Sequence, residues 1–233
     1  MAGPKPQIKE EGKGSADRPK RKRNARGEGA RLTEDIIAGA LSLIEREETD
    51  EAVTLRAVAR EIGIAAPSIY AHFPDRDAIV LAVVARAFDE LSQAITEGHV
   101  GVGPDPVERL VAGCEAYVSF GLRRSARYRV LFSEERLGGK NYCRPVAFAP
   151  SGHLLLEFGA ETFAILVDAL ETCVAAGRST STDPVADSTA IWVALHGTVS
   201  LKTALPGFPW PEPDRFVRQL VLRLARITSE PSA

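Results

Sequence analysis

VTLRAVAREIGIAAPSIYAHFPDRDAIV, residues 53–80, has the pattern of two short helices joined by a tight turn. Thr54 can accept a hydrogen bond from an orphan backbone N–H at the start of the first helix. Gly63 follows the last residue of the apolar repeat, where glycine forms a left-handed cap with least strain. Pro67 suits the first turn of the second helix, because its missing N–H leaves no bond unmade there. Two short helices with a glycine turn predict a helix-turn-helix.

The second helix of this motif has one apolar and one polar face. Ile69 and Phe73 are four residues apart and should face the core, whereas Tyr70 and His72 fall on the other side. Tyrosine and histidine can donate hydrogen bonds to phosphates or base edges. Asp75 can cap the long helix that follows. This pattern predicts a recognition helix for DNA.

These features together resemble the DNA-binding signature of the TetR family of bacterial one-component repressors. The matching features are the threonine-opened helix, the glycine turn, the Tyr-x-His-Phe end of the second helix, and the acidic and basic pair that opens the next helix. The resemblance extends over roughly residues 32–95. Arg76 departs from the pattern, since the family usually has lysine there, but it keeps a cation near a phosphate.

The resemblance implies roles for individual residues. Arg56 should reach a base or a phosphate, and its planar guanidinium can donate two hydrogen bonds to guanine. The tip of the second helix should approach base edges in the major groove, while the remaining polar side chains hold phosphates. The residues assigned to DNA in this way are Thr54, Arg56, Ala66, Pro67, Ser68, Tyr70, His72 and Arg76.

Length and composition favour an ordinary globular protein. The 233 residues, with 45% hydrophobic and 26% charged side chains, can form one large or two small domains. No apolar run approaches the roughly 20 residues that span a bilayer, and no hydrophobic signal core opens the chain, so we expect a cytoplasmic location. Cys114, Cys143 and Cys173 are far apart, which favours idle thiols over a disulfide or a metal site.

Charge is unevenly distributed along the chain. Residues 1–31 contain ten Lys or Arg against four Asp or Glu, a net charge of +6, and the remainder carries −8. An acidic body with a basic tail should repel DNA except at one end. The basic run includes Lys20, Arg21, Lys22 and Arg23. Two interpretations stay open: an arm in the DNA minor groove, or a solvated tail.

Helical periodicity predicts an all-α fold of about nine helices. An N-terminal helix-turn-helix domain should be joined by a long helix to a helical ligand-binding and dimerisation domain. We expect a disordered basic arm over residues 1–30, the DNA-binding domain over 31–97 and the regulatory domain over 98–233. Thr33 should cap the first helix. Besides the two helices of the motif, helices are predicted at 33–47, 75–97, 106–122, 126–134, 153–176, 184–204 and 212–228.

The last two predicted helices suit a four-helix dimer interface built from two copies of each. One has small residues at spacings of four, three and four, which permit close helix approach, and the other has an apolar stripe wider than one contact needs. A homodimer is therefore expected. The predicted interface consists of Ala190, Ala194, Gly197, Leu201, Phe216, Leu220 and Leu224.

Aromatic residues at helical spacing in the C-terminal half are candidates for an effector pocket. Trp192, His196 and Gly197 also resemble a tryptophan–histidine–glycine signature of one C-terminal subgroup of the TetR family. Pockets are mostly apolar with few polar groups, although such aromatics can equally be plain core. The candidate effector residues are Tyr117, Phe120, Phe158, Phe163, Trp192 and His196.

Patterns typical of enzymes do not occur. The four histidines are scattered, and the chain has no HExxH, glycine-rich phosphate loop or serine elbow, so neither catalysis nor a cofactor is expected. We expect a sequence-specific transcriptional regulator, a repressor released from a palindromic operator by a small molecule. Its partners would be double-stranded DNA, a second copy of itself and an unknown effector, with no membrane. Two alternatives remain: an enzyme or small-molecule carrier with a vestigial motif, and an architectural DNA binder acting through its tail.

Overall fold

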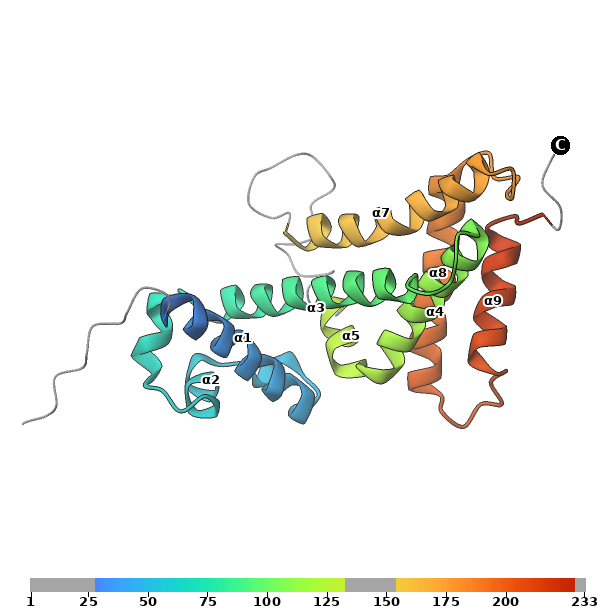
Figure 1. Ribbon diagram of the computed structural model, residues 1–233. Coiled ribbons are helices and arrows are strands. Elements are labelled where there is room, and N and C mark those ends of the chain that lie inside the picture. Colours follow the sequence, from blue (N-terminus) through green and yellow to red (C-terminus); the bar gives the residue numbers. More distant parts are fainter. Residues whose placement is uncertain (1–27, 133–153, 229–233) are drawn as a thin grey trace, which may run out of the picture.

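The structure is a computed structural model that describes residues 28–132 and 154–228, and Figure 1 shows helices throughout this part of the chain. It contains no strand there, only an isolated bridge between Ser179 and Ile227. Each of the nine expected helices has a counterpart among the described residues, and a short 3-10 helix is added. The all-α prediction is confirmed.

The N-terminal part is a small helical unit followed by a long helix. Its elements are α1 (Glu28–Glu47), the 3-10 helix η1 (Asp50–Ala52), α2 (Leu55–Glu61), the 3-10 helix η2 (Ala66–Ala71) and α3 (Arg76–Gly98).

The C-terminal part is a bundle into which α3 extends. Its elements are α4 (Pro106–Arg123), α5 (Ser125–Leu131), α7 (Leu154–Ala175), α8 (Pro184–Ala204) and α9 (Pro213–Leu224). In Figure 1, α3 runs from the N-terminal unit into the bundle, with α7 along one side and α5 on the other. None of the helices in the described segments is long and apolar enough to cross a membrane.

Side-chain caps begin α2 and α3 where the sequence predicts them, and a glycine follows the end of α2. The Thr54 hydroxyl accepts from the Ala57 N–H at 3.1 Å, and Asp75 accepts from Ala78 at 2.8 Å. Gly63 has φ 69°, the left-handed region that favours glycine.

The first helix begins earlier than expected. It starts at Glu28, which places Thr33 inside α1, where its hydroxyl donates to the Gly29 carbonyl at 3.1 Å. The prediction that Thr33 caps the helix is therefore wrong. Glu28–Ala30, assigned by the sequence pattern to the arm, are helical instead. Ala30 and Arg31 are exposed, so the apolar repeat gave no signal for this turn.

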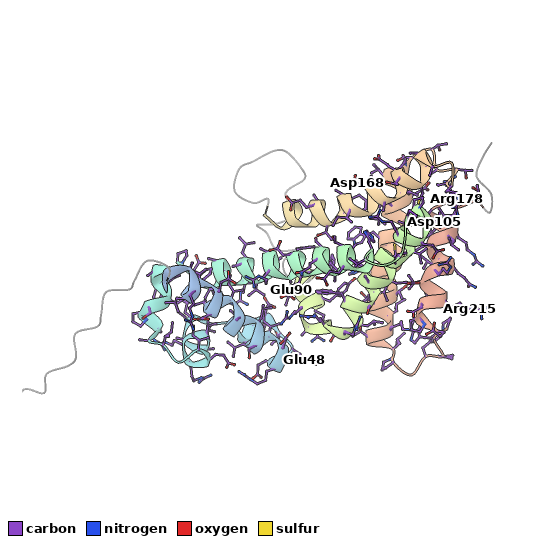
Figure 2. All side chains as sticks on the ribbon, viewed as in Figure 1. Glu48, Glu90, Asp105, Asp168, Arg178 and Arg215 are labelled. Atoms are coloured by element: carbon purple, nitrogen blue, oxygen red, sulfur yellow. The ribbon has the colours of Figure 1, made fainter. Side chains whose placement is uncertain are left out.

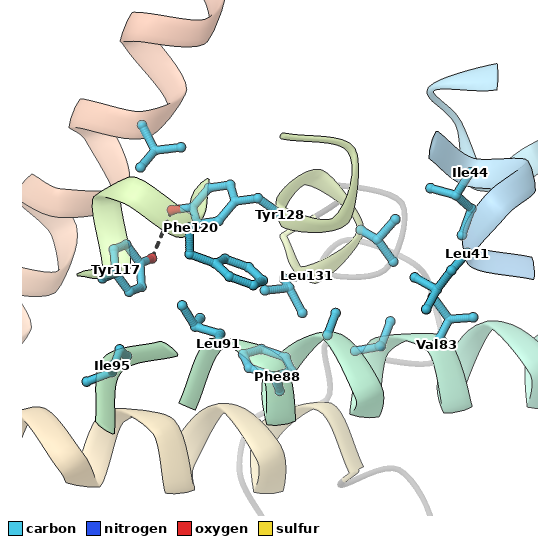
Figure 3. Close-up of a cluster of buried hydrophobic side chains, with 14 of the residues drawn as sticks. Leu41, Ile44, Val83, Phe88, Leu91, Ile95, Tyr117, Phe120, Tyr128 and Leu131 are labelled. Atoms are coloured by element: carbon cyan, nitrogen blue, oxygen red, sulfur yellow. Dashed lines mark hydrogen bonds between the residues drawn. The ribbon is translucent and has the colours of Figure 1, made fainter. Parts of the chain in front are cut away.

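One apolar core runs the length of α3. Figure 3 shows buried side chains from α1, including Leu41 and Ile44, meeting Val83 on α3, and the cluster continues through Phe88 to Leu131 of α5. Core residues near the glycine turn are also buried, since Val58 and Ile69 are fully covered. The same helix therefore contributes to both ends of this core.

Candidate nucleic-acid interface and effector site

Close packing between α1 and α2 fixes the scaffold of the helix-turn-helix. A Cβ added at Gly39 would lie 2.4 Å from Cγ2 of Ile62, so α1 needs glycine at this crossing. On the surface, Arg46 forms a two-pronged ion pair with Glu61, both N–O distances being 3.1 Å. Hydrogen bonds from Arg46 and then Ser42 lower the pKa of the Glu61 carboxyl. The first motif helix is thus held rigidly against α1.

The second motif helix is a 3-10 helix, η2, anchored from one side. Ile69 is fully buried and Phe73 is 7% exposed, as predicted. Tyr70 points the other way and is 62% exposed. Its six residues, Ala66–Ala71, exceed the three or four that a 3-10 helix usually reaches.

The predicted DNA-binding residues gather on the surface of α2 and η2. Thr54, Arg56, Pro67 and Tyr70 are exposed. The Arg56 guanidinium forms no ion pair or hydrogen bond with any residue of the described segments, and it remains available to an external partner. Ala66, Ser68 and His72 are half-buried.

His72 is held by α1. The Thr33 hydroxyl lies 3.0 Å from Nδ1 of His72 and already donates its proton to Gly29. His72 must therefore donate from Nδ1 to Thr33, which leaves Nε2 of the neutral ring as an acceptor. A hydrogen bond to a phosphate would need a second proton on this ring.

Arg76 is engaged with its own chain. Its Nε donates to the Val53 carbonyl at 3.0 Å, and Nη2 donates to the Asp50 carbonyl at 2.8 Å and contacts the Asp50 carboxylate at 3.2 Å. Nη1 reaches Asp77 at 3.3 Å. The guanidinium ties the start of α3 to the segment before α2. This positioning role is additional to the phosphate contact expected for Arg76, which stays a prediction. Lys20, Arg21, Lys22 and Arg23 lie outside the described residues.

Most of the predicted effector residues meet in an aromatic cluster between α4, α5, α7 and α8. The Phe163 and Trp192 ring centroids lie 6.2 Å apart, and Trp192 lies 6.4 Å from His196. Tyr117 bonds to Tyr128 through their hydroxyls at 2.8 Å, drawn as a dashed line in Figure 3.

Two members of the cluster were missed by the sequence pattern, and two predicted members do not join it. Tyr128 lies 2.7 Å from Nδ1 of His196, and Phe132 lies 4.6 Å from the His196 ring. Their four-residue spacing puts both on one face of a helix, which was the available signal. Phe120 packs in the apolar core of Figure 3 instead, with no ring partner among the described residues. The Phe158 side chain lies outside the described part.

Burial sets the protonation of the polar groups in this cluster. It raises the pKa of Tyr117 to about 12 and raises the pKa of Tyr128 further. It lowers the pKa of His196. The cluster is therefore uncharged at neutral pH.

A cavity of about 340 Å³ adjoins the cluster at the junction of the two parts. Of the predicted effector residues whose side chains the structure describes, only His196 lines it. Its walls come from α5 and α8 on one side and from the end of α1 with η1 on the other. Arginines of α5 hold the two sides together: Arg127 bonds Glu45 at 2.6 Å and also pairs with Glu90, and Arg129 lies 3.4 Å from Glu48. Figure 2 shows Glu90 and Glu48 on the α3 and α1 sides of this junction.

The face predicted for dimerisation is open to solvent on α8. Leu201 is 50% exposed, Ala190 is exposed, and Ala194 is half-buried. A Cβ added at Gly197 would meet nothing within 4 Å. On α9, Phe216 and Leu220 are half-buried, whereas Leu224 packs against the core. This surface is free for a partner except at Leu224.

Metal ligands are not grouped anywhere in the described segments, where no three His, Cys, Asp or Glu side chains could hold an ion. Cys114 and Cys173 are buried and free, and burial raises the pKa of the Cys114 thiol to about 12. The buried thiols therefore stay protonated at neutral pH.

Comparisons with known proteins agree with this architecture. Residues 36–83 match the family described as bacterial regulatory proteins, tetR family, and residues 110–224 match the tetracyclin repressor-like C-terminal domain. An uncharacterised HTH-type transcriptional regulator from Mycobacterium tuberculosis is 28% identical over 173 residues, covering 72% of this chain and 69% of that protein.

Solved structures share the fold. A protein of unknown function from Rhodococcus sp. RHA1 superposes with a TM-score of 0.69 at 24% identity, over 84% of this chain and 94% of the other. A bacterial regulatory protein in the tetR family from Rhodococcus RHA1 gives 0.62 at 19% identity, over 84% and 98%.

A helix-turn-helix whose long exit helix enters a helical bundle defines a DNA-binding transcriptional regulator, not an enzyme. The two family matches together span most of the described residues. The chain belongs to the TetR family of bacterial regulators.

Proposed function

We propose that this regulator is a repressor, released from a palindromic operator by a small-molecule effector. The observation that carries the proposal is the surface of α2 and η2, where Arg56, Pro67 and Tyr70 are exposed above a fully packed scaffold. A rigid scaffold with exposed donors suits base and phosphate contacts in a major groove.

The proposed roles follow the exposure of each residue. Arg56 reaches a base edge or phosphate, and the short side chains of Ala66, Pro67 and Ser68 allow η2 to approach bases closely. Thr54 and Tyr70 supply hydroxyls for phosphates. His72 contacts a phosphate only with its ring doubly protonated.

A homodimer would place two such surfaces on one duplex. The exposed face of α8, with Phe216 and Leu220 of α9, is the proposed interface, and operator symmetry then mirrors dimer symmetry. Trp192, His196 and Gly197 support membership of the tryptophan–histidine–glycine subgroup. The proposed domain division is a DNA-binding unit at 31–97 and a regulatory unit at 98–233.

The basic residues Lys20, Arg21, Lys22 and Arg23 are proposed to form a minor-groove arm. The geometry at the start of α1 supports this: Gly29 lies beside His72, whose Cε1 would be 3.8 Å from an added Cβ. The chain therefore leaves α1 next to the end of the recognition helix. Binding to chromosomal DNA would place the protein in the cytoplasm.

Release from the operator requires the effector to bind more tightly to the conformation of the regulator that cannot bind DNA. We propose that binding in the bundle moves α3 and changes the separation of the two recognition helices. A ligand that alters neither operator affinity nor that separation is not an effector.

Selection of random duplex DNA by the full-length protein tests the proposal. The expected result is a palindromic consensus, and Arg56→Ala should weaken binding to it by about 1–3 kcal/mol without lowering the unfolding temperature. Salt-sensitive binding with no consensus would favour an architectural role for the tail, and turnover or tight ligand binding without DNA preference would favour a carrier or enzyme.

A further inference from the structure

The 340 Å³ cavity is formed jointly by the DNA-binding and regulatory parts. Ile44 at the end of α1 and Thr49 beside η1 form one wall, and Ala126, Phe132 and Ser200 lie across from them on α5 and α8. Its volume falls at the lower end of the range for small-molecule sites. An occupant would contact both parts at once.

The hydrogen bonds at the α8 end of this cavity have a defined direction, because each hydroxyl has one proton to donate. The Tyr117 and Tyr128 hydroxyls are 2.8 Å apart, and Tyr128 lies 2.7 Å from Nδ1 of His196. If His196 donated from Nδ1, Tyr128 would donate to Tyr117, whose own proton would then have no acceptor among the described residues. Because both tyrosines are buried, a hydroxyl proton left without an acceptor would destabilise the fold. The chain of donors therefore runs from Tyr117 through Tyr128 to His196.

This direction leaves the proton of His196 on Nε2. That atom is 3.4 Å from the Ser200 hydroxyl, a long contact at the cavity wall. A ligand acceptor placed there would receive a better hydrogen bond than Ser200 provides. The α8 end of the cavity thus presents a fixed donor at Nε2 of His196.

The rest of the lining is mixed: Tyr128 and Phe132 place aromatic rings beside His196, whereas Glu48, Asp50 and Arg129 are charged. Phe132 lies 5.0 Å from Tyr128 and 4.6 Å from His196, centroid to centroid. At the rim, Arg129 pairs with Glu48 at 3.4 Å. The Asp50 carboxylate is paired with Arg76. A charged ligand would have to break one of these pairs.

We propose that this junction cavity is the effector site, and that it takes a neutral aromatic molecule with a carbonyl acceptor directed at Nε2 of His196. The inference rests on the proposed repressor function for its regulatory meaning. An occupant would separate the end of α1 from α5, against the ion pair between Arg127 and Glu45. That movement would alter the position of the helix-turn-helix relative to the bundle.

The probe is propionyl-dimethylaminonaphthalene, a neutral aromatic ketone whose emission shifts on burial. It should bind the full-length protein saturably, and dimethylaminonaphthalene without the carbonyl should bind more weakly. Ser200→Leu and Ala126→Leu fill the cavity from α8 and α5. Each should lower the affinity of the protein for the ketone by about tenfold or more. Thr203→Leu, at an exposed position of α8 that is not part of the cavity lining, should leave binding unchanged.

His196 variants test the donor. His196→Phe keeps a ring but removes the donor, and it should abolish the preference for the ketone. His196→Gln supplies an amide N–H donor and should retain part of the preference for the ketone. Melting curves accompany both, because Tyr128 loses an acceptor in the phenylalanine variant.

The regulatory step is tested separately with the selected operator. Ketone binding should lower operator affinity, and operator should lower ketone affinity by the same factor. No saturable ketone binding, binding undiminished by both filling variants, or equal binding of the carbonyl-free probe would overturn the site. Ketone binding that leaves operator affinity unchanged would overturn the effector role. Failure to select any operator would reject the proposed function. The probe titrations would still test whether the cavity binds the ketone.

Discussion

The Thr33 hydroxyl lies 3.0 Å from Nδ1 of His72, and this contact joins α1 to the end of the recognition helix across 39 positions of sequence. Thr33 also donates to Gly29, so its single proton is committed and His72 acts as the donor. The orientation of the His72 ring is therefore set by a residue outside the helix-turn-helix.

Replacing Thr33 by valine keeps the shape of the side chain and removes the acceptor for His72. We expect a loss of about 1 kcal/mol in the free energy of unfolding and a severalfold loss of operator affinity. Thr96→Val is the control, since the Thr96 hydroxyl donates to the Ser92 carbonyl on its own helix. Anisotropy with the selected operator measures the difference. Wild-type affinity in the Thr33 variant would show that the His72 orientation is unimportant for binding.

Gly39→Ala should destabilise the protein even though alanine favours a helix by about 1 kcal/mol. The new Cβ would lie 2.4 Å from Cγ2 of Ile62, a β-branched side chain that cannot easily turn away. The expected cost is about 1–3 kcal/mol, measured by urea unfolding.

Two variants separate this clash from a general effect of alanine. Ile62→Ala combined with Gly39→Ala should recover part of the loss, because the clashing methyl is gone. Gly159→Ala on α7, where the nearest atom of Phe88 is at an ordinary 3.5 Å, should be neutral or stabilising. Equal behaviour of the two glycine variants would contradict the close crossing of α1 and α2.

Arg76→Ala distinguishes positioning from phosphate binding. Because the guanidinium donates to the carbonyls of Val53 and Asp50, its loss should lower the free energy of unfolding by about 1–2 kcal/mol. A direct phosphate contact would in addition reduce the salt slope of DNA binding by about one, whereas an unchanged slope would leave positioning as the role of Arg76. Arg76→Lys sharpens the comparison. One ammonium group cannot reach both carbonyls, so the lysine variant should also lose stability. A phosphate role alone would leave the stability of this variant near that of the wild type.

Leu201→Glu should weaken the proposed dimer by about 2 kcal/mol or more, because it places two carboxylates at a closely packed helix face. Sedimentation velocity over a range of concentrations would show the shift to monomer. Val100→Glu is the matched control, as Val100 is 79% exposed in the turn after α3. A dimer equally stable in both variants would place the interface elsewhere.

The stability of the protein should fall on acidification through His196. Burial lowers the pKa of His196 in the folded protein, so the unfolded chain takes up a proton first as the pH drops below about 6.5. The stabilising contribution is complete above that pH and is lost as the pH falls toward the folded pKa. The difference in unfolding free energy between wild type and His196→Gln, followed from pH 7 to 5, isolates this effect from His99 and Glu115, whose pKa values are also shifted by burial. A difference independent of pH would contradict the assigned direction.

Local sequence rules were sufficient for the helices and for the motif. The Thr54 cap, the Gly63 turn and the Asp75 cap depend on neighbours within a few residues, and the structure confirms all three. Helical periodicity likewise predicted a long helix at 75–97, because one face of a helix recurs every three or four residues, and α3 spans Arg76–Gly98. The bounds of α8 agree with prediction for the same reason.

Contacts between distant segments were beyond such rules. The engagement of Arg76 with Asp50, the donor role of His72 toward Thr33, and the chain from Tyr117 through Tyr128 to His196 each join residues 11 to 68 positions apart. Side-chain type predicts which bonds a residue can make, but the packing of helices selects its partner. For the same reason, the motif alone identified a DNA-binding protein, while the folded arrangement of α1, α5 and α8 located the cavity between its two parts.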